Sequence, residues 1–224
     1  NKLIAVRDGF GMRPLCLGRS DHGIAVASES CALDSSNFQF ERDVKPGEMV
    51  VIEADGSMKS SIVLEENRTA FCLFEYIYFA RSDSEIDHLS VYQAHFNMGR
   101  QLAREFPVEA DMVCGVPDSG LDAAAGYAFE SGIPLGSGFT KNRYIGRSFI
   151  FPTQTQRDNA VRLKLNPLKA NIRGKRLVVV DDSIVRGTTS ARTVKMLRDA
   201  GAAEVHMRIS APPFTHTCSF WYGY

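Results

Sequence analysis

The spacing of hydrophobic and polar positions divides the chain into two regions of different character. In the first, short apolar runs at residues 2–6, 24–27 and 49–53 predict β-strands, and residues 54–57 have the composition of a hairpin turn. No stretch within the first sixty residues shows the spacing of three and four that marks a helix. We therefore expect a β-rich region without helices at the start of the chain.

From about residue 72 onward the pattern alternates between helices and buried strands. Apolar side chains at positions 91, 94, 98, 102 and 106 predict an amphipathic helix, and Gly201 stands where a helix-ending glycine belongs. This alternation predicts an α/β fold with a parallel sheet, so we expect one domain at residues 1–71 and another at residues 72–224. The expected helices cover residues 90–106, 121–130 and 191–200, and the expected strands cover residues 110–116, 176–180 and 204–210.

Composition excludes several classes of protein. The 224 residues include 26 Lys or Arg and 26 Asp or Glu, with 44% hydrophobic residues, which is ordinary for a globular protein and not for a disordered chain, a collagen or a coiled coil. No apolar run approaches the roughly 18 residues of a membrane span, and the first residues do not resemble a signal peptide. Five cysteines without a Cys-x-x-Cys pair favour neither a disulfide framework nor a zinc site. We expect a cytoplasmic protein with no membrane partner.

Positive charge is concentrated in one segment of this neutral chain. Residues 139–176 contain ten Lys or Arg and a single acid, Asp158. Such a segment is either a solvated face or a loop that binds anions. Phosphorylated small molecules use the same chemistry as nucleic acid, so the charge alone does not choose between these ligands.

The most informative stretch is residues 177–190, in which an apolar strand leads into Asp181 and Asp182 and then into a short hydroxyl-rich loop and a helix. Ligands of parallel sheets bind beyond the carboxyl ends of the strands. A helix start offers free N–H groups to a phosphate, while paired carboxylates suit sugar hydroxyls or hydrated Mg²⁺. The alternative is that a hydroxyl caps the helix and the acids are solvated. The whole context favours a sugar phosphate.

This stretch resembles the 5-phosphoribosyl-1-pyrophosphate (PRPP) motif of type I phosphoribosyltransferases over its full length. The resemblance implies the fold of that family, a parallel sheet with helices on both faces. It implies that Asp181 and Asp182 hold the 2′- and 3′-hydroxyls of the ribose. It assigns the 5′-phosphate to Ser183, Ile184, Val185, Arg186, Gly187, Thr188, Thr189 and Ser190.

Three more segments, residues 74–84, 115–120 and 141–147, are similar to the amidophosphoribosyltransferase family, and the similarity covers almost the entire chain. It implies a pentosyltransferase that forms 5-phosphoribosylamine from PRPP and glutamine-derived ammonia, the first step of de novo purine synthesis. Tyr76 resembles the residue lining the ammonia path, although a core tyrosine is an equal reading. The similarity also implies a diphosphate loop (Asp118, Ser119, Gly120), a Mg²⁺ site (Ser119, Asp181, Asp182) and a loop that closes over PRPP (Lys141, Arg143, Tyr144, Arg147).

The β-rich start resembles the later part of an N-terminal-nucleophile glutaminase domain, through residues 5–15 and 27–33. In that class the nucleophile is a cysteine at the mature N-terminus, whereas this chain begins with Asn1. Cys16 and Cys31 are internal, and we expect them to be core residues. The chain therefore resembles an internal piece of a longer enzyme that cannot hydrolyse glutamine by itself.

Cys72 and Cys218 resemble two of the four ligands of a 4Fe-4S cluster in one subclass of the family, and the alternative is a pair of unliganded thiols. Two rival functions remain open: a salvage phosphoribosyltransferase that uses a nucleobase, and a non-enzymatic regulator that senses PRPP. Residues 1–71 carry no helix-turn-helix pattern, so we expect no nucleic-acid partner. The family resemblance implies a homo-oligomer when the enzyme is full length.

Overall fold

The structure is a computed structural model that describes residues 1–66, 68–142, 165–185, 187–216 and 218. The chain divides into two compact units, Asn1–Ala94 and His95–Tyr224. The division falls inside the helix α2 (Val91–Glu105). The domain boundary after residue 71 stays a prediction.

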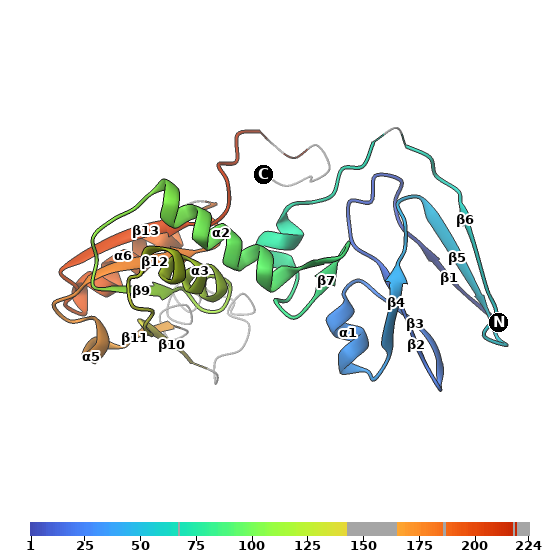
Figure 1. Ribbon diagram of the computed structural model, residues 1–224, viewed down its shortest axis with the longest axis horizontal. Helices are drawn as coiled ribbons and strands as arrows, with labels where there is room; N and C mark the ends of the chain where they lie inside the picture. The colour runs from blue at the N-terminus through green and yellow to red at the C-terminus, as the bar shows by residue number, and fades with distance from the viewer. Residues whose placement is uncertain (67, 143–164, 186, 217, 219–224) are drawn as a thin grey trace, which may run out of the picture. The chain divides into compact units, whose positions relative to one another are not determined.

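Two three-stranded antiparallel sheets make up most of the first unit (Figure 1). One sheet has the order β1-β5-β6 and the other has the order β3-β2-β4. Apolar side chains from both sheets and the segment after β4, among them Ala5, Leu17, Val44 and Val50, form one buried cluster. The strands are β1 (Lys2–Val6), β2 (Cys16–Ser20), β3 (Gly23–Ala27), β4 (Gln39–Asp43), β5 (Glu48–Glu53) and β6 (Met58–Ile62).

The expectation of a helix-free start is wrong, because α1 (Ser30–Ser35) lies between β3 and β4. Its six residues make fewer than two turns, so no helical repeat can appear in the sequence. Three strands of this unit, β2, β4 and β6, were not predicted: β2 has only two apolar residues, at its start, and the side chains of β4 and β6 are mostly exposed and show no clear alternation. The strand at residues 2–6 is confirmed. So is the turn at residues 54–57, where the Glu53 amide donates to the Ser57 carbonyl (2.9 Å).

The end of the first unit holds a short π-helix, η1 (Glu75–Phe79), and a small hairpin of β7 (Glu85–Ile86) and β8 (Leu89–Ser90). The Glu29 carboxylate accepts hydrogen bonds from the Arg81 amide (2.8 Å) and the Ser84 hydroxyl (2.9 Å). The hydroxyl of Ser30 accepts a third bond from the Glu85 amide (2.8 Å). Polar contacts therefore tie this segment to the start of α1.

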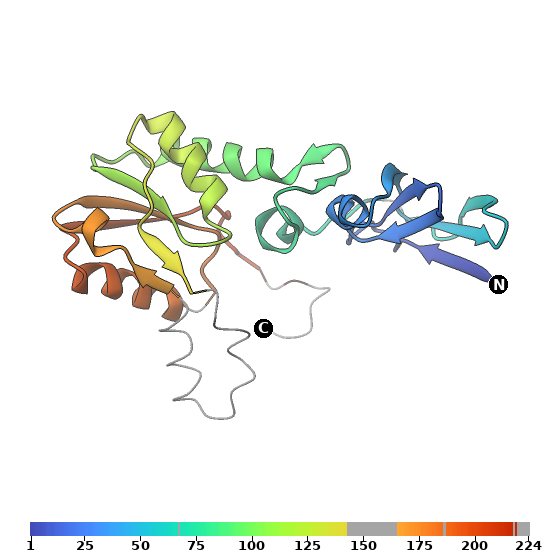
Figure 2. The same cartoon turned by 90° about the horizontal axis from the view of Figure 1, so that it is seen from below.

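A parallel sheet with helices on both faces forms the second unit, as Figures 1 and 2 show. Its order is β13-β12-β9, and successive strand residues pack on opposite faces. Val113, Val178 and Val180 pack with α2 and α3, whereas Cys114 and Val179 pack on the face of α5 and α6. The elements are β9 (Met112–Gly115), α3 (Leu121–Ser131), β10 (Phe139–Lys141), β11 (Leu165–Pro167), α5 (Lys169–Ile172), β12 (Arg176–Asp181), α6 (Thr188–Asp199) and β13 (Glu204–Ile209).

These elements confirm the predicted alternation. Buried strand residues give the continuous apolar runs that sheets covered on both faces require. Gly132 ends α3 in the left-handed conformation (φ 73°), within two residues of the expected helix end at residue 130. The helix α6 begins at Thr188, three residues before the predicted start, because polar side chains of its first turn conceal the apolar spacing.

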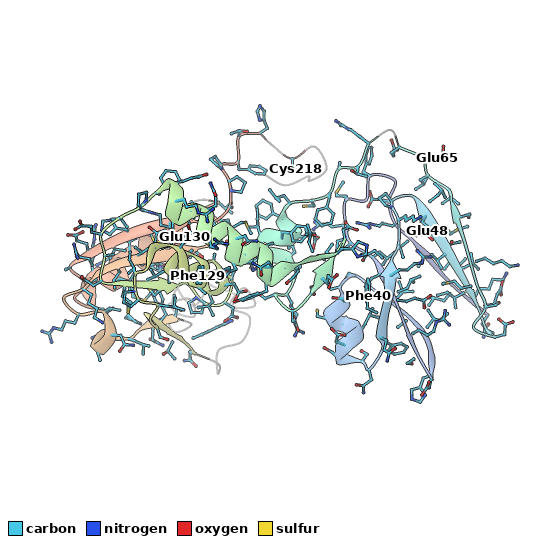
Figure 3. All side chains as sticks on the ribbon, in the orientation of Figure 1. Phe40, Glu48, Glu65, Phe129, Glu130 and Cys218 are labelled. Carbon is cyan, nitrogen blue, oxygen red and sulfur yellow. The ribbon has the colours of Figure 1, made fainter. Side chains whose placement is uncertain are left out.

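Ion pairs and rings join α2 and α3 on their outer surface. Arg100 and Arg104 both donate to the carboxylate of Glu130, at 2.9 and 2.6 Å, and Figure 3 labels Glu130 beside Phe129. The ring of Phe129 lies 5.6 Å from that of Phe96. None of the helices among the described residues has the length and apolar character of a membrane span.

The strand connections reverse direction between β9 and β12. After α3 the chain returns to the free side of β9, where Leu135 forms a parallel bridge with Val113 and the Val113 amide donates to the Pro134 carbonyl (2.9 Å). The later strands β12 and β13 lie on the other side of β9. Right-handed crossovers in opposite directions place α3 and α6 on opposite faces. The carboxyl ends of β9 and β12 thus flank a topological switch point, where ligands of such sheets bind.

Candidate functional site

Two buried carboxylates stand at the carboxyl end of β12. Asp181 and Asp182 are each only 7% exposed. Their backbone carbonyls accept hydrogen bonds from the amides of Ser210 (3.0 Å) and Ala211 (2.9 Å), which follow β13. The Asp182 amide donates to the Asp181 carboxylate (3.0 Å), and the Ser183 hydroxyl donates to the Asp182 carboxylate. The main chain of both acids is therefore held in place.

Burial changes the chemistry of Asp181. Desolvation, followed by the negative charge of Asp182, raises the pKa of Asp181 to about 6, and the hydrogen bond from the Asp182 amide opposes this shift only in part. A charged carboxylate in such a buried position is stabilised by hydrogen bonds from hydroxyl groups or by a cation. The pair is thus suited to sugar hydroxyls or a metal ion and unsuited to a phosphate.

The loop after the two acids leads to the N-terminus of α6. Gly187 has a positive φ of 72° immediately before Thr188, which begins the helix. The first-turn residues Thr188 and Thr189 are exposed, and the N–H groups of a first helical turn have no partner within the helix. This end of α6 can therefore receive an anion through backbone N–H groups and hydroxyls.

A second loop, residues 117–120, follows β9. Its Gly120 packs against the end of β12, because a Cβ at that position would lie 2.4 Å from the Val180 carbonyl oxygen. The Val116 amide donates to the same carbonyl (2.8 Å). The peptide bond between Pro117 and Asp118 is cis. The loops after β9 and β12 are therefore joined through main-chain contacts at the switch point.

Charges on this second loop are exposed. The carboxylate of Asp118 is 71% exposed and forms an ion pair with the Lys141 ammonium group at the end of β10. Ser119 is half-buried. The structure therefore brings together Asp118, Ser119, Gly120, Lys141 and the acids of β12 around the carboxyl edge of the sheet.

Other predicted site residues are not brought into this group. Arg143, Tyr144, Arg147 and Arg186 lie outside the described residues. Tyr76 lies in the first unit, where it is buried and its hydroxyl donates to the Ile86 carbonyl (2.6 Å). Desolvation is the main cause that raises the pKa of this hydroxyl. These contacts fit a core tyrosine, and the ammonia path stays a prediction.

The cysteines divide into buried and accessible ones. Cys16 and Cys31 are buried as predicted, and burial raises the pKa of Cys16 to about 12, so neither resembles a reactive thiol. Cys72 is half-buried and Cys218, labelled in Figure 3, is exposed. Among the described residues, no three His, Cys, Asp or Glu side chains gather into a metal site. The cluster stays a prediction that rests on the resemblance of Cys72 and Cys218.

Sequence reasoning missed several groups that shape the site. Ser210 and Ala211 act through their backbone amides, which leave no trace in the sequence. His95 is 6% exposed, with Nδ1 3.4 Å from the carboxylate of Asp122 in the first turn of α3. His95 lies on the apolar face of α2, so the helical spacing could have predicted that this polar side chain is buried. Its Nε2 has no hydrogen-bond partner among the described residues.

Comparisons with known proteins agree with this geometry. The phosphoribosyl transferase domain family matches residues 87–211. An amidophosphoribosyltransferase of Archaeoglobus fulgidus is 56% identical over 218 residues, which cover 97% of this chain and 48% of that protein. One from Mycobacterium bovis is 55% identical over 220 residues, covering 98% of this chain and 41% of that protein.

A solved structure extends the similarity to three dimensions. The glutamine phosphoribosylpyrophosphate amidotransferase from B. subtilis, complexed with ADP and GMP, superposes with a TM-score of 0.88 at 50% identity. The superposition covers 97% of this chain and 48% of that one. The chain thus spans about half the length of the relatives that it matches.

Proposed function

The chain belongs to the phosphoribosyl transferase domain family, and on that premise we propose that its switch-point site binds PRPP with Mg²⁺ for amidophosphoribosyl transfer. The observation that carries the proposal is the pair of buried acids, Asp181 and Asp182, followed by a short loop that leads to the N-terminus of α6. The acids accept hydrogen bonds from the ribose hydroxyls, and the loop to Ser190 receives the 5′-phosphate. The relatives named above, all amidophosphoribosyltransferases, support this choice of reaction.

The residues present also fit a magnesium ion. Mg²⁺ in sites of this kind takes one or two carboxylates together with substrate phosphates and keeps several waters. Asp181 and Asp182 supply two carboxylates whose negative charges repel each other, and Ser119 supplies a hydroxyl from the neighbouring loop. When bound, the ion neutralises charge on the departing diphosphate.

In the proposed reaction, the ammonia nitrogen forms a bond to the anomeric carbon while the bond from that carbon to the diphosphate oxygen breaks. The protonated amine that forms, R–NH3⁺, then loses a proton to solvent and leaves the neutral product amine. Neutral ammonia needs no general base, so the task of the chain is to position PRPP and to stabilise the leaving charge. Lys141 supplies positive charge beside the loop of residues 117–120 for this purpose.

Glutamine as the source of ammonia, Tyr76 as part of its path and the first step of purine synthesis as the setting belong to the same proposal. They rest on the names of the relatives and on the resemblance of residues 5–15 and 27–33 to a glutaminase domain. The salvage alternative predicts a nucleobase as acceptor, and the sensor alternative predicts PRPP binding without turnover.

Calorimetry with PRPP and Mg²⁺ tests the proposal on the 224-residue chain, with ribose 5-phosphate and inorganic diphosphate as partial ligands. We expect PRPP to bind more tightly than either part, because both loops contribute contacts. No detectable binding of PRPP would contradict the proposal. Release of diphosphate from PRPP with ammonium, but not with adenine, guanine or hypoxanthine, separates amidotransfer from salvage.

A further inference from the structure

A carboxylate in a loop that binds diphosphate presents a physical conflict. Asp118 carries a negative charge where the proposed ligand brings several more, and like charges in one site repel. Yet its carboxylate pairs with Lys141, a cation beside this loop that would attract the same ligand. The ion pair between Asp118 and Lys141 must therefore change when an anionic ligand binds.

The position of Lys141 is fixed by its strand. β10 pairs antiparallel with β11 from Phe139 to Lys141, and the Leu168 amide donates to the Gly138 carbonyl (2.9 Å). Phe139 is 6% exposed and lies in the cluster under α5 and α6. The backbone at Lys141 is thus anchored, while its side chain is 40% exposed and its ammonium group can change partner by side-chain rotation.

We propose that Asp118 is a stand-in anion that holds Lys141 until diphosphate replaces it. The ligand takes the ammonium group from Asp118, so binding includes the loss of one ion pair and a new repulsion with the freed carboxylate. Asp118 therefore lowers the affinity for diphosphate and speeds its release. This role differs from the sequence-based expectation that Asp118 contacts the substrate, and it rests on the proposed function of the site.

Calorimetry with inorganic diphosphate, in chelator and at low salt, compares the wild-type chain with Asp118→Asn. Exposed ion pairs contribute modestly, so we expect the variant to bind about two- to fivefold more tightly. Lys141→Gln binds more weakly than wild type. The control is Asp199→Asn, which removes another exposed carboxylate from a lysine pair in the second unit (Lys195, 2.8 Å) and leaves affinity unchanged.

The double variant separates exchange of partners from simple repulsion. If Lys141 changes partner, Asp118→Asn tightens binding much less in the Lys141→Gln background than in wild type. An equal gain in both backgrounds, an unchanged affinity or weaker binding overturns the proposal. A loss of affinity that occurs only when Mg²⁺ is added also overturns it, because Asp118 is then a metal ligand.

The outcomes remain distinct from failure of the proposed function. A wild-type chain that binds neither diphosphate nor PRPP contradicts both ideas, whereas normal binding without the gain in Asp118→Asn overturns this inference alone. Thermal unfolding checks that each variant is folded. Should Asp118→Asn unfold, Asp118→Ser takes its place with the same expected direction.

Discussion

The loops after β9 and β12 meet at the same edge of the sheet but hold their acids in opposite ways. Asp181 and Asp182 are almost fully buried, with their main chain bonded to Ser210 and Ala211. Asp118 is largely exposed and forms an ion pair with Lys141. A buried carboxylate must be compensated by hydroxyl donors or a cation, so it selects such partners. An exposed carboxylate interacts only weakly with nearby charges, and we infer that Asp118 changes only the affinity for diphosphate.

The glycines of the two loops differ in the same sense. Gly120 is needed because the main chain of β12 leaves no room for a Cβ. A Cβ at Gly187 would meet no atom of the described residues within 4 Å, and this glycine is needed for its positive φ. One loop thus depends on close packing and the other on backbone conformation. Substitutions at these two glycines and at the acids test whether the two loops differ in this way.

The largest expected effect follows from Gly120→Ala. The added methyl would overlap the Val180 carbonyl, so the loop or the strand must shift, and we expect the free energy of unfolding to fall by about 3 kcal/mol. Gly187→Ala, the matched substitution in open space, costs only about 1 kcal/mol for its left-handed backbone. Urea unfolding measures both. Equal losses would show that packing at Gly120 does not distinguish the loops.

The next effect concerns binding. Asp182→Asn removes a buried carboxylate that we propose accepts hydrogen bonds from the ribose, and a bond to a charged group contributes about 2 kcal/mol. We expect the Kd for PRPP to rise about 30-fold by calorimetry. The exposed counterpart, Asp118→Asn, does not weaken binding. A similar loss in both variants would contradict the contrast between buried and exposed acids.

A smaller effect depends on pH. The pKa of Asp181 is about 6 in the folded chain and near 4 when unfolded, so the native state binds the proton more tightly. The free energy of unfolding therefore falls as pH rises from about 4 to 6, and the penalty remains above that range. Asp181→Asn removes it, and we expect this variant to be more stable than wild type by about 1–2 kcal/mol at pH 8 and nearly equal at pH 4.

Urea unfolding across that range checks the prediction, with Asp199→Asn as an exposed control whose difference from wild type stays small. A stability difference for Asp181→Asn that does not change with pH would exclude a raised pKa as its cause. Weaker PRPP binding by this more stable variant would mark a residue that serves binding at a cost in stability.

The smallest effect is the stability of the exposed pair. Asp118→Asn removes an ion pair between two accessible side chains, so the free energy of unfolding changes by less than about 1 kcal/mol, and 0.5 M salt reduces the change further. Thermal unfolding of the wild type and the variant at two salt concentrations measures this change. A loss of several kcal/mol would mean that the pair organises the loop.

Much of the second unit could be predicted from sequence because its buried strands and amphipathic helices carry strong patterns. Val178 and Val180 face one cluster and Val179 the other, which reads as one continuous apolar run. The reversal between β9 and β12 could not be predicted, since the return to β9 is a bridge at one residue, Leu135. In the first unit, α1 is too short to show a repeat.

The two acids of the site could be predicted from the sequence, but the groups that surround them could not. Asp181 and Asp182 stand out because they follow an apolar run, but nothing in the sequence indicates that amides of Ser210 and Ala211 hold their main chain. The pair between Asp118 and Lys141 joins residues 23 positions apart, one on a loop and the other at the end of β10. The roles of Arg143, Tyr144 and Arg147, the iron–sulfur cluster, self-association and a cytoplasmic setting stay predictions.

Hydrogen exchange measured by mass spectrometry, with and without PRPP and Mg²⁺, shows whether PRPP binds at the start of α6. We predict that PRPP slows exchange at the amides of residues 183–190, because a phosphate at the start of α6 takes its hydrogen bonds from them. Residues 30–35 of α1 serve as an internal reference that PRPP leaves unchanged. Binding of PRPP that protects other segments and leaves residues 183–190 exchanging freely would contradict the account.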